Sequence, residues 1–465
     1  MADEIWIVPF FGQGHMFPSI ELCKHLASRN VKTVLVISSK LSSTVPLSLR
    51  QYPLVEINEI SEAPPLEPSS QPLHRHHEHH SQIALGLEKL LSTRNHDQGS
   101  VRPLYAVVDM KMSWTFDIFN RYEVPAVSFF TSGAFSAALE YAMWKDHPSD
   151  VKAGETRLLP GLPEEMAITV SDLKRQIRFP TEPPPQTKFG PEGHHPTNLG
   201  DKPPWVEAIE PCIGVMINTC DELEQPFIEY VSNKLGKPVW GVGPFLPEQY
   251  WKSADSVFYD HKFRTNQKSN VSENEVNDWL DTKPSGSVLY ISFGTVVRPF
   301  KEEYEMLAEA LEALTRPFVW VVRANAGLST GLIIRGWAPQ LLILSHPSTG
   351  GFLSHCGWNS TVEAIGRGVP FLAWPIRGDQ HSNAKLITSY LKVGYMISED
   401  VSRTIKKENI TRGIEKLLND QEMKQRAVKL SAKFEHGFPT SSVAALDAFG
   451  DFIRQRPRNL SSSTF

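Results

Sequence analysis

A histidine and an aspartate stand where a catalytic base and its partner acid would be needed. His15 closes the sequence GQGH directly after an apolar run at residues 5–10, and Asp109 closes a second apolar run at 104–109. If His15 opens a helix, the positive end of the helix dipole favours its neutral form, which suits a general base. A carboxylate on the other ring nitrogen stabilises the imidazolium that forms when the base takes a proton. Position alone leaves a second interpretation open, in which Asp109 caps a helix and His15 is a polar surface residue.

The glycines beside the histidine begin like the dinucleotide fingerprint G-x-G-x-x-G and then depart from it. Phe17 stands where the third glycine is required, and the next apolar run ends in Ser38, Ser39 and Lys40, without an acid for a ribose. The sequence therefore argues against a nicotinamide cofactor. It also argues against a sugar-nucleotide epimerase, which depends on that cofactor.

The second half of the chain contains a pattern that is typical of an anion site. The run GGFLSHCG at residues 350–357 predicts a strand and a glycine turn, and a helix is expected to begin directly after it. The free amides and the dipole of such a helix start hold a phosphate or diphosphate. His355 and Ser360 add side-chain donors, and Thr295 adds a hydroxyl at the end of another predicted strand.

Neighbouring side chains suit the remaining parts of a sugar nucleotide. Trp337 offers a flat face for a base, Gln340 an amide for a base edge, and Glu363 a carboxylate for ribose hydroxyls. Asp379 and Gln380 combine acceptors and donors, which sugar hydroxyls require. Each of these residues alone is equally compatible with packing or capping. Their concentration in one short stretch indicates a site for a nucleotide and a sugar.

The elements that position these residues alternate between short apolar runs and helical patterns, which is typical of βα units on a parallel sheet. The alternation restarts after a polar stretch, so we expect two α/β halves. We predict an N-terminal Rossmann-like domain at 1–245, a linker at 246–260, a C-terminal Rossmann-like domain at 261–440, and a helix and tail at 441–465. Ligands bind beyond the carboxyl ends of parallel strands, so the crevice between the halves is the expected site.

Composition narrows the partners and the compartment. The chain has 465 residues, with 47 basic and 52 acidic side chains, so it offers no basic field for nucleic acid or an anionic membrane. No apolar stretch reaches the ~18 residues of a membrane span, and the N-terminal run is too short and glycine-broken for a signal peptide. The 4 cysteines form no C-x-x-C pair, which favours reduced thiols. We expect a cytoplasmic monomer that acts on small molecules.

Residues 337–380 resemble the sugar-donor box of the plant family 1 UDP-glycosyltransferases, which are small-molecule glycosyltransferases of the GT-B fold. The match includes the opening WAPQ, the central HCGWNS, Glu363, the GVP triplet and the closing Asp-Gln. It continues outside the box in GQGH, VVD, the NT and ELE pieces of residues 218–224, and SFGT. The family often has Ser at the position of Thr295 and Asn at the position of Phe17. The resemblance implies an α/β GT-B fold, in which two Rossmann-like parallel-sheet domains face each other across a cleft and a C-terminal helix straps back to the N-terminal domain.

The resemblance also assigns roles to individual residues. It makes His15 the catalytic base and Asp109 its orienting acid. It assigns donor binding to Gly14, Thr131, Thr295, Trp337, Ala338, Gln340, His355, Gly357, Trp358, Asn359, Ser360, Glu363, Asp379 and Gln380. In this set Trp337, Gln340 and Glu363 take the uridine, His355, Asn359, Ser360 and Thr295 the diphosphate, and Trp358, Asp379, Gln380 and Thr131 the sugar.

The implied activity is inverting transfer of glucose from UDP-glucose to a hydroxyl of a plant specialised metabolite, such as a flavonoid or another phenolic. No cofactor and no metal are expected. Gln380 usually accompanies glucose as the donor sugar in this family. A terpenoid or steroid acceptor and attack through carbon stay open. A UDP-sugar-binding protein without catalysis is a further alternative, against which the base dyad argues.

The acceptor side carries weaker signals. Aromatic and apolar side chains of the N-terminal half are compatible with a pocket lining or with core packing: Phe129, Phe130, Phe135, Trp144 and Met112. Residues 160–211 hold 11 of the 35 prolines, a density that excludes long regular elements, and we expect them to form a lid on the acceptor side. We interpret the tract from His74 to His80 as a solvated helix start near the pocket mouth, with metal binding as the alternative.

Overall fold

The computed structural model describes residues 4–61, 72–96, 103–148, 150–177, 200–252, 256–260, 268–322, 331–398 and 405–455. At 72–79, 95–96 and 176–177 it describes only the backbone. The middle of the proline-rich segment, 178–199, and the histidine side chains before residue 80 lie outside the described residues. The expectations for the lid and for the histidine tract therefore stay predictions.

The N-terminal half is built on a seven-stranded sheet in the order β3-β2-β1-β4-β5-β8-β9, in which all neighbours are parallel. Its strands are β1 (Glu4–Val8), β2 (Lys32–Ser38), β3 (Val55–Ile60), β4 (Tyr105–Asp109), β5 (Ala126–Phe130), β8 (Val215–Ile217) and β9 (Val239–Gly241). The central strands β1, β4 and β5 are buried along their whole length, as expected of parallel strands covered on both faces.

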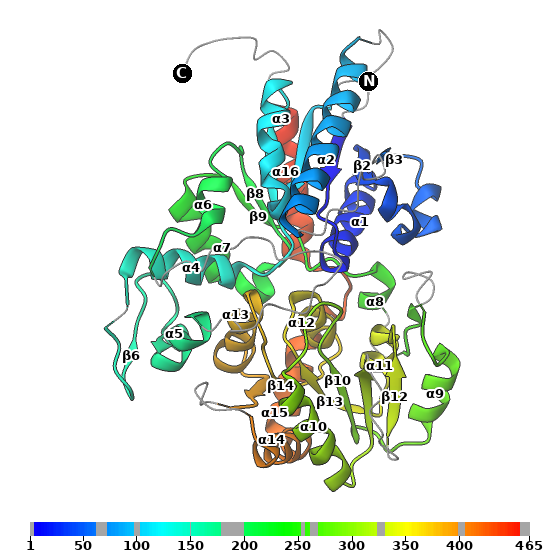
Figure 1. The fold of residues 1–465 in the computed structure, drawn as a ribbon, viewed down its shortest axis with the longest axis vertical. Helices are drawn as coiled ribbons and strands as arrows, with labels where there is room; N and C mark the ends of the chain where they lie inside the picture. The colour runs from blue at the N-terminus through cyan, green and yellow to red at the C-terminus, as the bar shows by residue number, and fades with distance from the viewer. Residues whose placement is uncertain are drawn as a thin grey trace.

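Most helices of this half lie against the faces of the sheet (Figure 1). The helices are α1 (Gln13–Ala27), α2 (Pro72–His96), α3 (Phe116–Arg121), α4 (Ala134–Asp146), α5 (Val170–Ile177), α6 (Pro204–Ala208) and α7 (Asp221–Leu235). Of these, α5 contacts the C-terminal half instead. Side chains alternate along β1, so Ile5 and Ile7 face the core under α1, while Trp6 and Val8 face the core under α2 and α3. A two-stranded antiparallel hairpin, β6 (Thr156–Arg157) with β7 (Ile168–Thr169), lies outside the sheet.

The C-terminal half is built on a six-stranded parallel sheet in the order β12-β11-β10-β13-β14-β15. Its strands are β10 (Val288–Ser292), β11 (Phe318–Val322), β12 (Leu332–Arg335), β13 (Thr349–Ser354), β14 (Phe371–Ala373) and β15 (Gly394–Met396). Its helices are α9 (Glu273–Asp281), α10 (Lys301–Ala313), α11 (Gln340–Ser345), α12 (Trp358–Ile365), α13 (Asp379–Lys385) with the π-helical η6 (Leu386–Tyr390), α14 (Lys407–Asn419) and α15 (Gln421–Ser431).

Two α/β halves therefore stack one above the other (Figure 1), which confirms the predicted fold class. The sequence patterns missed the edge strands β3 and β12. β3 reads VEINEI and is mostly half-buried, and β12 has only four residues, so neither shows the continuous apolar run of a central strand.

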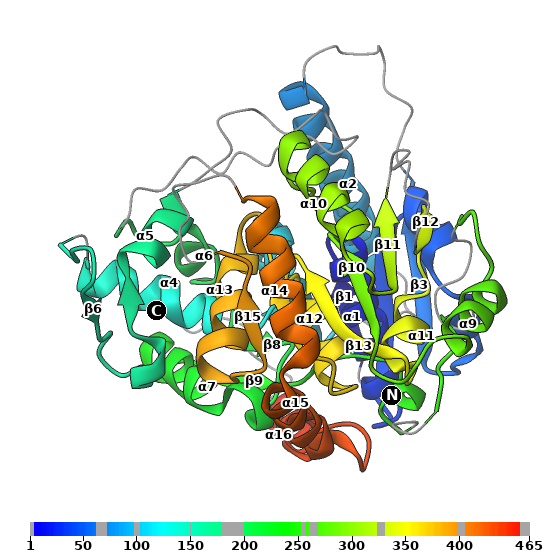
Figure 2. The ribbon, with the colours of Figure 1, turned by 90° about the horizontal axis from the view of Figure 1, so that it is seen from below.

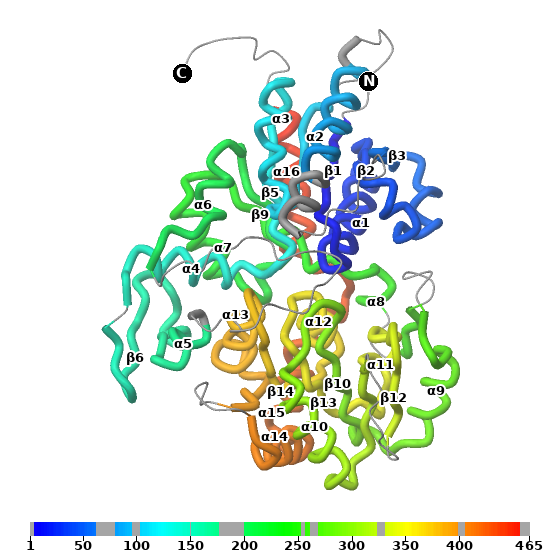
Figure 3. The backbone as a smooth tube through the Cα atoms, viewed as in Figure 1, coloured from blue at the N-terminus to red at the C-terminus, as the bar shows by residue number. Residues whose placement is uncertain are grey.

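The last helix, α16 (Thr440–Gln455), returns from the C-terminal half and packs beside β9 of the N-terminal sheet (Figure 3). Leu446, Phe449 and Ile453 are buried in the same core as α1. The Phe449 ring lies 5.3 Å from the Trp240 ring, centroid to centroid. This is the strapping helix that the resemblance implied.

A short linker helix, α8 (Glu248–Lys252), joins the halves and is held on α12 through Tyr250. The buried Tyr250 hydroxyl donates to the Glu363 carbonyl at 2.7 Å. Arg367 donates to the Tyr250 carbonyl at 2.6 Å, and its guanidinium lies 4.1 Å from the centre of the Tyr250 ring. No helix in the described part of the chain is long and apolar enough to cross a membrane.

Phe449→Ala tests whether the strap stabilises the N-terminal half. Phe449 is fully buried, so its loss should reduce the free energy of unfolding by about 3–5 kcal/mol in urea denaturation. Val443→Ala in the same helix is the control, because Val443 is 37% exposed and should change stability by less than about 1 kcal/mol. Equal effects of the two substitutions would contradict this role.

His25 should make the free energy of unfolding depend on pH. Its ring stacks on Phe438 and lies near Phe245, and burial, aided by the charge of Arg29, lowers the pKa of His25 to about 4. The unfolded chain, with a histidine pKa of about 6.5, binds more protons between these values, so stability falls as pH falls through this window.

The pH dependence is measured by urea unfolding of His25→Gln and wild type at pH 7 and pH 5. The wild type should lose more stability than the variant on acidification. His436→Gln is the matched control, because that side chain is 92% exposed. A wild-type loss no larger than that of His25→Gln would refute the assignment.

Candidate active site

The predicted base and acid meet at the ends of two neighbouring strands. Val8 pairs with Val108, so β1 and β4 end at the same edge, and α1 starts from the loop after β1. His15 Nδ1 lies 2.7 Å from Asp109 Oδ2, and the Asp109 side chain is buried. Asp109 Oδ1 accepts the Lys111 amide at 2.9 Å, which fixes the carboxylate. Because Nδ1 faces the carboxylate, Nε2 is the ring nitrogen that would take a substrate proton.

Thr131 lies on the base itself. Its hydroxyl oxygen is 2.9 Å from His15 Nδ1, and its carbonyl accepts from the Asn218 side chain at 3.3 Å. The resemblance implied contact with the sugar, whereas the structure places the Thr131 hydroxyl beside the Asp109 carboxylate on the same ring nitrogen. Thr131 follows β5, the strand next to β4, which explains why it reaches the dyad.

The predicted anion site forms where α12 begins. Gly357 is the N-cap, and the first amides of a helix have no partner inside it. The His355 imidazole lies against Gly294, which has a φ of 70° and where a Cβ would lie 2.7 Å from Nε2. Burial lowers the pKa of His355 to about 4, so the ring is neutral near pH 7 and can present an N–H without a net charge. Thr295 is exposed at the same turn.

Two of the three residues expected to hold the uridine, Gln340 and Glu363, are hydrogen-bonded to each other. The Gln340 amide nitrogen donates to Ser360 Oγ at 2.9 Å and to Glu363 Oε2 at 2.6 Å. Gln340 Oε1 accepts the Tyr290 hydroxyl at 3.0 Å. Gln340 thus orients the buried Glu363 carboxylate. Tyr290 in turn positions Gln340, and the sequence gave no signal for this role because Tyr290 lies within an apolar strand.

The predicted base-stacking residue Trp337 is half-buried, and its ring packs edge-on against Phe17 across the crevice, with centroids 6.4 Å apart. The neighbouring Ala338 is buried and its carbonyl accepts the Gln340 amide at 2.8 Å. Phe17 thus places an aromatic ring from α1 beside Trp337, at a position where the family commonly has Asn.

Two of the four residues expected at the sugar, Asp379 and Gln380, open α13. Gln380 Oε1 accepts the amides of Ile376 at 3.0 Å and Arg377 at 3.1 Å, so the carboxamide oxygen fixes the turn and the NH₂ group is the part left for a sugar. Burial raises the pKa of the Asp379 carboxyl, while a hydrogen bond from Asn383 and the charges of His15 and Lys111 act in the opposite direction. Asp379 therefore lies close enough to His15 for their charges to interact.

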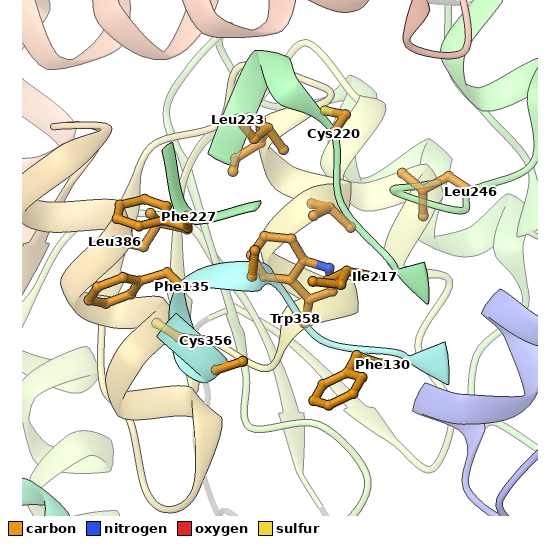
Figure 4. Close-up of a cluster of buried hydrophobic side chains, with 14 of the residues drawn as sticks. Phe130, Phe135, Ile217, Cys220, Leu223, Phe227, Leu246, Cys356, Trp358 and Leu386 are labelled. Carbon is orange, nitrogen blue, oxygen red and sulfur yellow. The ribbon is translucent and has the colours of Figure 1, made fainter. Parts of the chain in front are cut away.

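Trp358 takes a different place from the one expected at the sugar. Its buried indole donates from Nε1 to the Asn218 carbonyl at 2.7 Å and packs among apolar side chains of both halves (Figure 4). A Cβ at Gly133 would lie 2.7 Å from the ring. The ring therefore packs in the apolar contact between the halves. Burial of so large an aromatic ring is favourable there, and the ring does not line the crevice.

Asn359, the next residue of α12, donates to the carbonyl of Gly14 at 3.2 Å. This bond joins the helix start of one half to the turn that carries His15 in the other. Within the described residues, no group of three His, Cys, Asp or Glu side chains could hold a metal ion.

Of the two interpretations left open for the aromatic and apolar side chains of the N-terminal half, the structure favours core packing. Phe129, Phe130, Phe135 and Met112 are buried in the core, and Trp144 packs partly against it. Two consecutive phenylalanines lie beside the base instead, with ring centroids of Phe10 and His15 5.1 Å apart and those of Phe10 and Phe11 3.9 Å apart. Their position directly before GQGH was the sequence signal that could have selected them.

Farther along this half, the His80 ring stacks on the Trp114 ring, with centroids 4.6 Å apart.

Comparisons with known proteins agree with this geometry. Residues 259–444 match the family described as UDP-glucoronosyl and UDP-glucosyl transferase. The chain is 29% identical to a scopoletin glucosyltransferase of Nicotiana tabacum over 90% of each chain. It is also 29% identical to UDP-glucosyl transferase 73CC6 of Saponaria officinalis over 92% of each chain.

Solved structures share the fold. UGT73P12 of Glycyrrhiza uralensis has a TM-score of 0.76 at 22% identity, covering 98% of this chain and 96% of its own. UGT2 of Phytolacca americana has a TM-score of 0.71 at 24% identity, covering 98% of this chain and 100% of its own. With the site motifs and the two facing sheets, these likenesses support a plant family 1 UDP-glycosyltransferase.

Proposed function

We propose that this enzyme transfers glucose from UDP-glucose to a hydroxyl of a phenolic acceptor, with inversion at the anomeric carbon. The observation that carries the proposal is the His15–Asp109 pair at 2.7 Å, in a turn that the start of α12 contacts through Asn359. A protein that only binds UDP-sugars has no use for an oriented base.

In the proposed reaction the acceptor hydroxyl lies against His15 Nε2, which takes its proton. The acceptor oxygen forms a bond to the anomeric carbon while the bond from that carbon to the diphosphate oxygen breaks, and its electron pair leaves with UDP. Asp109 stabilises the imidazolium, and the proton then passes to solvent. Attack opposite the leaving group converts an α-linked donor into a β-glycoside.

The charge that develops on UDP is met by the start of α12. Its free amides, the Ser360 hydroxyl and the neutral His355 are the donors available in this chain. This donor set supports a reaction that needs no divalent metal and no cofactor.

Glucose is the donor sugar that the site supports best. The Gln380 NH₂ group and the Asp379 carboxylate supply a donor and an acceptor for sugar hydroxyls. The named relatives include a scopoletin glucosyltransferase and UDP-glucosyl transferase 73CC6, which is consistent with this choice.

A flat phenolic acceptor is supported by the aromatic rings of Phe10 and Phe11 beside the base. Structures of the neighbours contain pterostilbene in one case and quercetin in another, both aromatic compounds. We further propose that the enzyme works as a monomer in the cytosol, where its 4 buried free cysteines stay reduced.

His15→Ala is the decisive test of this function. UDP release and product mass are measured with UDP-glucose and a panel of phenolic, terpenoid and steroid acceptors in the presence of EDTA. The wild type should glucosylate a phenolic, and kcat of the variant should fall by about 10²–10⁴-fold because the base is lost.

UDP affinity of His15→Ala, measured by calorimetry, should stay within about 2-fold, since the uridine and diphosphate groups belong to the other half. His436→Ala, at an exposed histidine, is the control and should keep wild-type turnover. Near-wild-type transfer by His15→Ala, or loss of wild-type activity with EDTA, would contradict the mechanism.

Glu363→Gln tests the uridine side. The substitution removes the charge of a buried carboxylate that is aimed by Gln340, and loss of a charge-assisted bond to ribose should weaken UDP binding by roughly 10–100-fold. KM for UDP-glucose should rise more than kcat falls. Glu422→Gln, at an exposed side chain, should bind UDP as the wild type does. Unchanged UDP affinity in a folded Glu363→Gln protein would remove Glu363 from the site.

A further inference from the structure

A largely buried ion pair joins the two halves at the C-terminal end of α13. Lys385, the last residue of α13, lies 2.9 Å through Nζ from Asp172 Oδ2 in the first turn of α5. The two side chains are 10% and 11% exposed. α5 belongs to the N-terminal half and α13 to the C-terminal half, and the two helices lie side by side in Figures 1 and 2.

Both charges are embedded in further hydrogen bonds. Asp172 Oδ2 also accepts the amide and the hydroxyl of Thr169, each at 2.9 Å, and Lys385 Nζ donates to the Ala167 carbonyl at 2.8 Å. Burial raises the pKa of the Asp172 carboxyl, but Lys385 and Thr169 outweigh it and hold the pKa below its usual value. The carboxylate is thus charged near pH 7 and the pair is intact.

A second contact fixes the same segment on the C-terminal half. Arg175 of α5 donates to the Ser398 carbonyl, beyond β15, at 3.1 Å. The 3₁₀ turn η4 (Glu164–Met166) packs against η6, which directly continues α13. The described first part of the proline-rich segment therefore rests on η6 and on the residues after β15.

α13 is short, so the position of Lys385 at its last residue affects the position of its first turn. It has 7 residues, and at about 1.5 Å per residue its ends lie roughly 9 Å apart. Asp379 and Gln380 occupy its first turn, where Asp379 is within electrostatic reach of His15. A shift or tilt at Lys385 would move both sugar-facing side chains relative to the base.

We propose that the Asp172–Lys385 pair is a positioning pair that sets the orientation of Asp379 and Gln380 opposite His15, and so the choice of donor sugar. This inference rests on the proposed function. Neither residue touches substrate, and both act through α13.

The test compares Lys385→Met, Asp172→Asn and the charge exchange D172K/K385D with wild type. Steady-state rates are measured with UDP-glucose and UDP-galactose, which differ at one sugar hydroxyl, and UDP affinity is measured by calorimetry. Each single variant should lower the kcat/KM ratio of UDP-glucose over UDP-galactose at least fivefold. UDP affinity should stay within about 2-fold because Trp337 and Glu363 lie on other elements.

The charge exchange re-forms the ion pair but not the bonds to Thr169 and Ala167, so it should restore only part of the donor ratio. A changed donor ratio at constant UDP affinity is the result that a merely structural role would not produce. Lys202→Met removes one partner of the exposed Lys202–Glu210 pair and should leave the ratio unchanged. If either single variant fails to fold, the double variant D172N/K385M carries the test, because it leaves no unpaired buried charge.

An unchanged donor ratio in folded single or double variants would overturn the inference while leaving the glycosyltransferase function intact. A loss of UDP affinity as large as the change in donor ratio would also overturn it, since the effect would then not be confined to α13. Wild-type protein that transfers no sugar from either donor would overturn the proposed function and this inference with it.

Discussion

The burial of the Trp358 indole in the opposite half is the contact on which the geometry of the site depends. Its N–H donates to the Asn218 carbonyl, and its ring is enclosed by side chains of both halves. Because Trp358 is the first residue of α12, this anchoring also fixes the direction in which the amides of α12 point. Asn359 then reaches Gly14, so the anion site and the helix that carries His15 are held in one arrangement.

The N-terminal half makes room for this indole at the N-terminus of α4, whose capping group comes from another helix. Gly133 precedes α4 and provides no side-chain cap, since any Cβ there would meet the Trp358 ring. Glu224, fully buried on α7, accepts the amides of Ala134 and Phe135 at 2.8 Å each and replaces the missing local cap. Burial raises the pKa of this carboxyl and its hydrogen bonds oppose that rise. The NT and ELE pieces of the sequence thus support the wall that receives Trp358.

The fold could be predicted where local pattern and burial coincide. Central strands such as β1, β4 and β10 are buried on both faces and appear in the sequence as apolar runs. Edge strands face solvent along one side, so β3 and β12 lack that signal. The strap α16 was expected as a helix at 441–465, and its docking beside Trp240 buries its apolar side chains.

The sequence by itself determined which chemical groups stand at strand ends and helix starts, because those positions follow from local pattern. His15, Asp109 and the residues of 337–380 were found in this way. Only the tertiary structure decided which group each one contacts. Thr131 lies on His15, Gln340 orients Glu363, and Lys385 pairs with Asp172 from the other half. Such pairings join elements far apart in the chain, and they are selected by burial and by the need of each buried polar group for a partner, which no local pattern encodes.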